Sequence, residues 1–358
     1  MMINAVSTLP ALSTSRGALR WKQLHKRSRF TLIGTLLLFG LIGLEPVARL
    51  YWAVVHRVPF FGTSQIWKTF YPEWDLSGIE SAPTGREDGF FDVLILGAST
   101  VAPKGITQDL QEELTKSVVR PVRVWNLACP GRLSIDNVRL YERAFDRRFD
   151  LVVYYQGIND VFMNNTPPGS FRDDYSHSYH VRRYDAFQQQ DGIACFALSF
   201  TLKYLVCMKL DLWKISNRPR GEYATFAADL RTPPVFQANL ERLASMAAER
   251  GDRLMIMTFA YYIPRDYSEE AFAAKQLDYD LHLVNIGTWG LPGPLRRGID
   301  AHNERIVRVH DQQPDLLYVD QRALIPDGKQ YWHDCCHFTD AGCRLWAQNV
   351  AKVVGARW

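Results

Sequence analysis

Short apolar runs alternate with amphipathic stretches through the chain from about residue 90 onward. The apolar runs have the length and composition of strands buried on both faces of a sheet, at Val93–Leu96, Val122–Leu127, Leu151–Tyr155, Leu254–Thr258 and Leu316–Asp320. Helical spacing of apolar residues falls between and after them, at Gln108–Val118, Ile135–Arg147, Val235–Arg250, Gly298–His310 and Asp340–Val354. This alternation predicts an α/β fold with a doubly wound parallel sheet.

Two stretches interrupt the alternation. About seventy residues separate Phe162 from Pro233, far more than a usual connection. Within them Asn164–Tyr184 is polar and turn-rich, whereas Ile193–Trp213 is apolar with two lysines. We expect the apolar part to form a helix packed on the body, with a helix on the membrane surface as the alternative. The second stretch, Asn285–Leu295, is rich in glycine and proline, and both are candidates for the walls of a substrate cleft.

The N-terminal part has an uncharged apolar run at Phe30–Leu44, preceded by six basic residues and no acidic one after Arg16. The run is short for a membrane span, but apolar residues resume at Leu50–Val55, and Glu45 and Arg49 are spaced to pair on a helix. A secretory signal and a buried core helix are the alternatives. Because no small-residue cleavage motif follows the run, we expect an uncleaved single-pass anchor. The basic flank predicts a cytoplasmic N-terminus and an exported body at the inner membrane.

The expected layout is a basic cytoplasmic tail at 1–29, an anchor at 30–55, a linker without clear elements at 56–89, and a body at 90–358 with an insertion at 163–232. We expect the tail to be disordered as far as Trp21. The composition, 47% hydrophobic and 22% charged, excludes wholesale disorder. Without the six basic residues before Phe30, 36 basic residues face 38 acidic ones, so the nearly neutral body argues against a nucleic-acid partner.

Six cysteines fit an oxidising compartment: Cys129, Cys195, Cys207, Cys335, Cys336 and Cys343. The pairings left open are Cys195 with Cys207, and Cys129 with Cys335 or Cys336. For Cys129 and Cys336 we favour small buried thiols.

Ser99 is the first candidate for chemistry. The run Phe91–Leu96 stops at Gly97, so Ser99 comes just after the carboxyl end of a buried strand, where open α/β sheets bind their ligands. A predicted helix follows, which places Ser99 on a turn with free amide groups. This position suits a nucleophilic serine, although a helix-capping serine is the ordinary alternative.

Two further strand ends carry polar or flexible residues. Gly131 follows the second strand and can turn its backbone N–H toward a ligand at the same sheet edge. Asn159 follows the third strand and offers a neutral N–H donor, which suits a site where an oxyanion develops. Ordinary loop and turn residues are the alternative for both.

The segment 333–342 combines His337 with Asp334 three residues before it. A histidine is the natural base for a serine hydroxyl at neutral pH, and a carboxylate beside it fixes its tautomer. One alternative is a zinc site made of His333, Cys335, Cys336 and His337, although adjacent cysteines match zinc spacing poorly. The other is a capping aspartate beside a surface histidine.

These blocks, in this order, resemble the SGNH (GDSL-like) hydrolase family from about Phe91 to the C-terminus, apart from the insertions. Two positions depart from the family pattern: Ala98 stands where aspartate is frequent, and Ala128 where glycine is frequent. The matching blocks are Gly97-Ala98-Ser99, Gly131, Gly157-x-Asn159-Asp160 and Asp334-x-x-His337.

The resemblance implies a flavodoxin-like three-layer α/β/α sandwich and a serine esterase site without metal or organic cofactor. Ser99 would attack an ester carbonyl, His337 would act as the base, and Asp334 would orient it. The oxyanion hole would consist of the Ser99 and Gly131 N–H groups and the Asn159 side chain. Gly97, Gly157 and Asp160 would support the structure of the site.

The resulting expectation is a membrane-anchored, exported esterase that removes an O-acyl group, in particular O-acetyl, from a cell-envelope glycan or exopolysaccharide. The alternatives are an O-acyltransferase with a sugar hydroxyl as acceptor, a lipid or thioester hydrolase, and a non-catalytic glycan-binding module. The oligomeric state does not follow from the sequence.

Overall fold

The chain divides into two compact units. A computed structural model describes residues 15–63, 66–70, 72–80, 88–144, 147–178, 181, 185, 196–202, 205–206 and 229–358. The smaller unit contains Met1–Phe70 and Gly192–Met208, and the larger contains Tyr71–Asp191 and Lys209–Trp358. Much of the predicted insertion at 163–232 lies outside the described residues.

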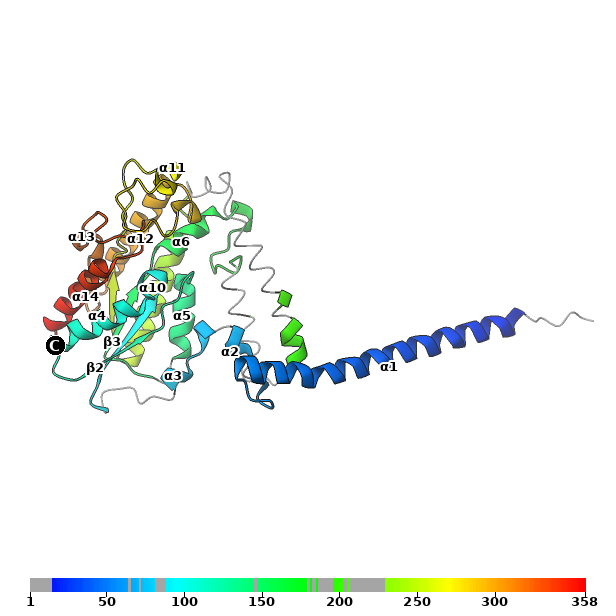
Figure 1. The fold of residues 1–358 in the computed structure, drawn as a ribbon. Coiled ribbons are helices and arrows are strands. Elements are labelled where there is room, and N and C mark those ends of the chain that lie inside the picture. Colours follow the sequence, from blue (N-terminus) through cyan, green and yellow to red (C-terminus); the bar gives the residue numbers. More distant parts are fainter. Residues whose placement is uncertain are drawn as a thin grey trace, which may run out of the picture. The chain divides into compact units, whose positions relative to one another are not determined.

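The larger unit is built on a five-stranded sheet in which every neighbouring pair is parallel (Figure 1). Its strands lie in the order β2-β1-β3-β4-β5, which is the flavodoxin-like arrangement. The five predicted strands are confirmed, each with ends within two residues of those observed. They are β1 (Phe91–Gly97), β2 (Val122–Asn126), β3 (Leu151–Tyr155), β4 (Arg253–Met257) and β5 (Leu317–Val319).

Helices cover both faces of this sheet, as the α/β/α prediction requires. α4 (Lys104–Thr115) packs against α14 (Asp340–Gly355), and α10 (Thr232–Arg250) packs against α5 (Ser134–Arg143) and α12 (Pro292–Gln312). The chain moves from β1 to β2 in one direction across the sheet and from β3 to β4 in the other. Right-handed crossovers therefore place α4 and α10 on opposite faces.

Helix α12 begins at Pro292, six residues earlier than the predicted start at Gly298. Its first turn contains prolines, which lack an N–H, and the first-turn amides of a helix have no acceptor within it. The shorter helical elements of the larger unit are η2 (Pro72–Trp74), α3 (Ser77–Glu80), η4 (Ser99–Val101), α6 (Ile158–Phe162), η5 (Met163–Asn165), η6 (Pro168–Ser170), α11 (Glu269–Ala273), η8 (Ile286–Thr288) and α13 (Gln321–Leu324).

Part of the predicted linker is ordered into short helices rather than lacking elements. η2 and α3 lie within it, and Trp74 is 3% exposed. The guanidinium of Arg132 lies over the Trp74 ring, 5.0 Å from its centroid. Burial of an aromatic side chain of this size stabilises the element that carries it, which a reading of turn residues alone does not reveal.

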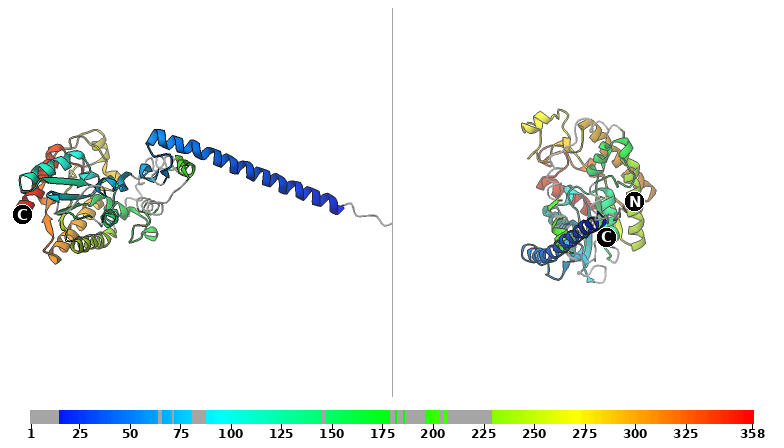
Figure 2. Two further views of the ribbon diagram at one scale, coloured as in Figure 1. Left: turned by 90° about the horizontal axis from the view of Figure 1, so that it is seen from below. Right: turned by 90° about the vertical axis from the view of Figure 1, so that its right-hand side faces the viewer.

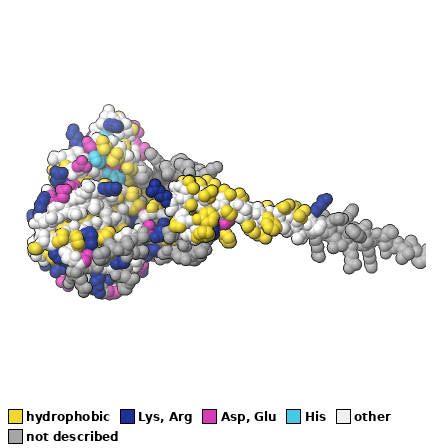
Figure 3. Space-filling view, turned by 60° about the horizontal axis from the view of Figure 1, so that its bottom comes forward, with side chains coloured by type: hydrophobic (Ala, Val, Ile, Leu, Met, Phe, Trp, Pro, Cys, Tyr) yellow, Lys and Arg dark blue, Asp and Glu magenta, His cyan; other side chains and the backbone are white. Residues whose placement is uncertain are grey.

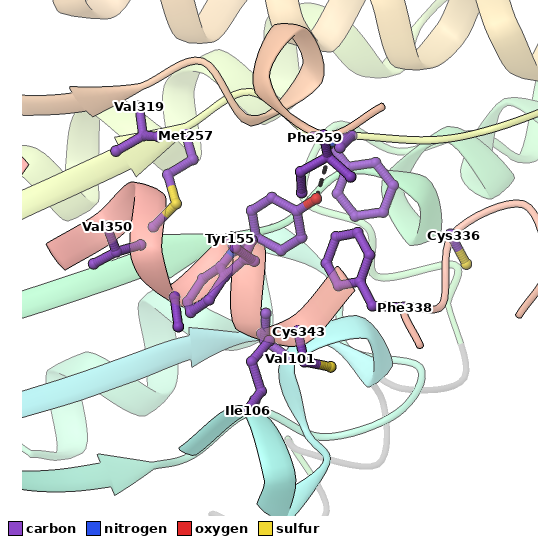
Figure 4. Packing of buried hydrophobic residues seen from close by; sticks show 14 of the residues in the cluster. Val101, Ile106, Tyr155, Met257, Phe259, Val319, Cys336, Phe338, Cys343 and Val350 are labelled. Atoms are coloured by element: carbon purple, nitrogen blue, oxygen red, sulfur yellow. Dashed lines mark hydrogen bonds between the residues drawn. The ribbon is translucent and has the colours of Figure 1, made fainter. Parts of the chain in front are cut away.

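Aromatic packing at the end of β3 joins the sheet to the last loop of the chain (Figure 4). Tyr155 stacks on Phe259 with 5.1 Å between ring centroids, and Phe338 lies 6.2 Å from Tyr155. The Tyr155 hydroxyl accepts a hydrogen bond from the amide of Ala260 at 3.0 Å. Phe338 therefore anchors the loop before α14 to the carboxyl edge of the sheet.

The smaller unit contains the long helix α1 (Ser15–His56) and α2 (Ile66–Phe70). α1 is helical from Ser15, which corrects the prediction of a disordered tail as far as Trp21; residues 1–14 lie outside the description. Its part Ser28–His56 is long and apolar enough to cross a membrane. Figure 2 shows this helix from two further sides. Its hydrophobic side chains are exposed, and they appear in yellow in the space-filling view (Figure 3). The predicted pair forms, with 2.7 Å between Arg49 Nε and Glu45 Oε1.

The apolar part of the insertion differs from its prediction. Its described residues, 196–202 and 205–206, belong to the same compact unit as α1, whereas the prediction assigned them to the body. Residues 197–202 are helical. Cys195 and Cys207, whose pairing the sequence left open, lie outside the described residues.

Candidate active site

Ser99 lies at the point where the strand order of the sheet reverses direction. β1 ends at Gly97, beside the end of β3 at Tyr155, and the chain leaves these two strands toward opposite sides of the sheet. Such a reversal point is where doubly wound sheets bind ligands. A Cβ on Gly97 would lie 2.6 Å from the carbonyl oxygen of Tyr155, so only glycine permits this approach. Ser99 then begins the short helix η4.

The structure brings His337 to Ser99 across 238 positions of sequence. His337 Nε2 lies 3.0 Å from Ser99 Oγ, within hydrogen-bond distance. The histidine belongs to the loop between α13 and α14, where its carbonyl accepts the amide of His333 at 2.8 Å. Its side chain is 18% exposed, so the imidazole is not fully closed off from solvent.

Asp334 completes a chain of hydrogen bonds behind the histidine. Its Oδ2 lies 2.7 Å from His337 Nδ1, and its side chain is fully buried. Oδ1 accepts the backbone amides of Cys336 and His337, and Oδ2 also accepts the amide of Val284 at 3.1 Å. The carboxylate therefore holds the proton on Nδ1 and leaves Nε2 as an acceptor for the Ser99 hydroxyl.

Asn159 lies after β3, in α6, with both ends of its amide engaged. Its Nδ2 donates to the carbonyl of Arg132 at 3.0 Å, and its Oδ1 accepts the indole N–H of Trp289 at 3.1 Å. The amide nitrogen carries a second N–H for another acceptor. The side chain is 9% exposed, so a bond from this second N–H would form largely away from water.

Gly131 and Asn159 line one cavity of about 370 Å³. Gly131 has φ of +81°, a conformation that glycine adopts readily and other residues avoid. Trp289 also lines the cavity, and its ring centroid lies 6.4 Å from that of His337. Ser99 itself is not among the lining residues, which also include Leu133, Phe162, Met163, Thr166, His177, Ser178 and Thr288.

Asp160 and Gly157 hold the loop that carries Asn159. Asp160 is fully buried and accepts hydrogen bonds from the Ser134 amide, the Ser134 hydroxyl at 2.5 Å and Gln156 Nε2 at 2.9 Å. Burial raises the pKa of its carboxyl to about 6. A Cβ on Gly157 would lie 2.6 Å from the Phe259 ring, so a larger residue would displace one of them.

Two residues that position the site were not predicted from the sequence. Asn126 donates from Nδ2 to the carbonyl of Val101 at 2.7 Å and to the Thr107 hydroxyl at 2.8 Å. These two hydrogen bonds fix the position of the turn that begins at Ser99. The sequence feature that could have indicated this role of Asn126 is its position at the end of a strand. For Trp289 the only such feature was its place in a glycine- and proline-rich stretch, because its partner Asn159 is 130 positions away.

The cysteines near the site are thiols. Cys335, Cys336 and Cys343 are buried and unbridged, so Cys129 forms no disulfide with Cys335 or Cys336. Cys336 Sγ lies 3.5 Å from His337 Nδ1. Burial raises the pKa of the Cys336 thiol well above its usual value, so the thiol is uncharged at neutral pH beside the histidine.

The residues of the zinc alternative are engaged elsewhere. His333 Nδ1 lies 2.8 Å from Asp280 Oδ2, while the ring nitrogens of His337 contact Asp334 and Ser99. A donor group of Asp334, Cys335 and Cys336 does lie within 4.8 Å. Neither histidine belongs to it, and the Asp334 oxygens already accept backbone amides. The structure therefore does not assemble the proposed set of four ligands.

Comparison with known proteins finds distant structural likenesses. No model of a protein family matches the chain, and no curated protein matches it. A GDSL-like lipase from Bacteroides thetaiotaomicron is 11% identical, with 83% of this chain and 100% of that one covered and a TM-score of 0.44. The acetylxylan esterase Axe2 from Geobacillus stearothermophilus is 15% identical, with 74% and 94% covered and a TM-score of 0.42. A putative acylhydrolase from Bacteroides fragilis is 11% identical, with 79% and 94% covered and a TM-score of 0.42.

Likenesses at this distance carry no argument about activity. The sheet order and the contacts at its carboxyl edge are independent of them, because they are properties of this chain alone. Ser99, His337 and Asp334 form one chain of hydrogen bonds. The described part of the protein thus has the parallel sheet that the resemblance to the SGNH (GDSL-like) hydrolases implied.

Proposed function

We propose that the protein is a serine ester hydrolase of the SGNH type. The observation that carries the proposal is the line of contacts from Asp334 through His337 to Ser99, at the reversal point of the sheet. A serine hydroxyl beside an imidazole, which is itself oriented by a buried carboxylate, is the arrangement required for acyl transfer.

In the proposed reaction, His337 Nε2 takes the hydroxyl proton as Ser99 Oγ attacks the ester carbonyl carbon. The carbonyl electron pair moves to oxygen, where the Ser99 and Gly131 N–H groups and the second Asn159 N–H stabilise the charge. Collapse expels the alcohol, which takes the proton from His337, and leaves acyl-Ser99. Water then attacks the acyl-enzyme by the same route and releases the acid. Asp334 orients His337 and stabilises the imidazolium in both halves of the reaction.

The substrate we propose is an O-acetyl ester on a cell-envelope or secreted glycan. The cavity beside Gly131 and Asn159, about 370 Å³, is near the lower end of the range for ligand pockets, which suits a small acyl group or one sugar unit. Its lining residues include Trp289 together with Thr166, Ser178 and Thr288. Such a mixture provides hydrogen bonds for sugar hydroxyls together with an apolar face.

We also propose that α1 anchors the protein in the inner membrane, with the body exported. The support is the apolar length of Ser28–His56 and the basic residues before Phe30. We expect the full-length protein to stay in the membrane fraction after alkaline extraction. We also expect protease added to spheroplasts to digest the body. If the protease does not digest the body in spheroplasts, the body lies in the cytoplasm and the proposed topology is wrong.

The test of the proposed activity uses the full-length protein in detergent. Wild type should react with a fluorophosphonate probe and hydrolyse a chromogenic acetyl ester, and Ser99→Ala should lose labelling and at least about 10³-fold in kcat. Ser245→Ala is the matched control, because Ser245 is an exposed serine on α10. It should behave as wild type.

Acetate release from an O-acetylated glycan then tests the substrate. No labelling of a folded wild type would overturn the serine mechanism. Labelling together with transfer of acetyl to an added sugar acceptor, without net acetate release, would replace the hydrolase by an acyltransferase that uses the same residues.

A further inference from the structure

The smaller unit contains a second helical segment bound along α1. Glu45 of α1 accepts the backbone amides of Ala197 and Leu198, each at 2.9 Å, at the start of this segment. Further along, Trp52 Nε1 donates to Thr201 Oγ1 at 2.9 Å. Residue 197 lies beside 45 and residue 201 beside 52, so the two helical stretches run in the same direction.

Polar groups at this contact are satisfied within the protein. The first amides of a helix have no acceptor in the helix itself, and in a bilayer they need a partner other than water. Glu45 supplies that partner for two of them, and Arg49 Nε offsets its charge at 2.7 Å. Trp52 is 1% exposed, so its indole N–H and the Thr201 hydroxyl are paired in a closed contact.

Most exposed side chains among the described residues of the segment are apolar. Its large exposed side chains are Phe196 (71% exposed), Leu202 (55%), Leu205 (53%) and Val206 (57%). Exposed apolar residues also surround the adjoining part of α1, among them Val47, Leu50 and Val54. A groove of about 590 Å³ lies between the two, lined mainly by Leu38, Ile42, Pro46, Phe196, Leu198 and Leu202. Apolar patches of this kind are unusual on a surface that faces water.

The position along α1 indicates the depth of the segment in a bilayer. About twenty helical residues cross the hydrocarbon layer, so a span that begins near Phe30 reaches the outer boundary near Leu50. Glu45 then lies roughly 7 Å inside that boundary, at a rise of about 1.5 Å per residue. The segment starts at this depth beside Glu45 and runs outward beside Trp52.

We propose that the described residues 196–202 and 205–206 belong to a second membrane-embedded element, inserted into the outer half of the bilayer and bound to α1 through Glu45. This inference rests on the proposed anchor. The occupant of the groove between the two elements is the acyl chain of a membrane lipid, since its wall is apolar and continuous with the lipid-facing surface of α1. Because the chain on both sides of the segment belongs to the larger unit, that unit is tethered to the membrane by more than one connection.

The test is photocrosslinking of the full-length protein reconstituted in phosphatidylethanolamine and phosphatidylglycerol vesicles. p-Benzoylphenylalanine replaces Leu202 in the segment, Leu37 in α1, or Leu324 in the larger unit. All three leucines are exposed by about half or more, so the probe itself is equally accessible. We expect phospholipid adducts, detected by mass, at positions 202 and 37 and none at 324.

Each other outcome is decisive. Adducts at 37 without adducts at 202 would overturn the second element and leave the anchor standing, whereas no adduct at either would overturn both. Crosslinks from 202 to a second copy of the chain would show that protein, not lipid, covers the segment.

Glu45→Leu separates insertion from docking, because it removes the acceptor of the Ala197 and Leu198 amides without adding charge. We expect lipid adducts at 202 to fall to the level at 324 while those at 37 persist. Glu241→Leu, on α10 of the larger unit, is the matched control and should change neither. Unchanged adducts at 202 in Glu45→Leu would overturn docking through this carboxylate.

Discussion

Trp289 donates its indole N–H to the side-chain oxygen of Asn159, with 3.1 Å between the atoms. Indole is a donor only, so this bond determines which end of the amide is oxygen. The nitrogen must then face the Arg132 carbonyl and the cavity, where a donor is required. Trp289 is thus a positioning residue that acts through Asn159.

Trp289→Phe retains an aromatic ring and removes the donor. A neutral hydrogen bond contributes about 1 kcal/mol, so we expect a loss of roughly fivefold in kcat for ester hydrolysis. KM should change little if the amide contacts the oxyanion mainly in the transition state. Trp358→Phe, which changes a partly exposed tryptophan at the C-terminus, is the matched control. A loss confined to KM would contradict the positioning role.

Asn159→Ala removes one oxyanion donor, and we expect it to cost about 3 kcal/mol, on the order of 10²-fold in kcat. If Trp289 acts through Asn159, the double variant should be no slower than Asn159→Ala alone. Steady-state kinetics of the four proteins in this cycle measure the coupling. Additive losses would show that Trp289 contributes by another route, such as its place near the His337 ring.

Asp160→Ala should lower stability much more than a surface change. It leaves the Ser134 amide, the Ser134 hydroxyl and Gln156 Nε2 without their buried acceptor, which we expect to cost about 3 kcal/mol. Thermal unfolding of the full-length protein in detergent measures the change in Tm. Asp173→Ala, at an exposed aspartate, is the control and should shift Tm little. Equal Tm values for the two variants would remove the structural role of Asp160.

His302 predicts how stability depends on pH. It is fully buried, stacked on Phe236 and hydrogen-bonded to the Thr232 hydroxyl at 2.9 Å, and burial lowers its pKa to about 3. The unfolded chain binds a proton here below about pH 6.5, whereas the folded protein does so only below about 3. The contribution of His302 to the free energy of unfolding is therefore fully present above about pH 6.5. It is lost as the pH falls, by about 3 kcal/mol at pH 4.

The measurement is Tm between pH 7 and pH 4 for wild type and His302→Gln, which cannot titrate. We expect the decline to be shallower in the variant. The raised pKa of Asp160 has the opposite effect on stability, because its contribution is fully present below about pH 4 and is lost by about pH 6. The slope of Tm against pH must therefore be compared between wild type and the variant. Parallel slopes would show that His302 is accessible to protons in the folded state.

The periodicity of apolar residues was sufficient to predict the five strands, the five main helices and the α/β class. This prediction succeeds because buried positions repeat at the period of the helix or strand that contains them. The type of each element can therefore be inferred from its own segment of sequence. The same reasoning placed Ser99, Gly131 and Asn159 at one edge of the sheet, since the carboxyl ends of parallel strands lie together. It also predicted the pair of Glu45 and Arg49, which are neighbours on one helix.

Contacts between distant segments were decided only by the tertiary structure. The 3.0 Å contact of His337 with Ser99, and the orientation of Asn159 by Trp289, depend on how loops pack over the finished sheet. The apolar insertion was expected on the body, yet its described residues lie on α1. Hydrophobicity shows that such a segment is buried or in lipid, but its partner is chosen by complementary polar groups far away in sequence, here the Glu45 carboxylate.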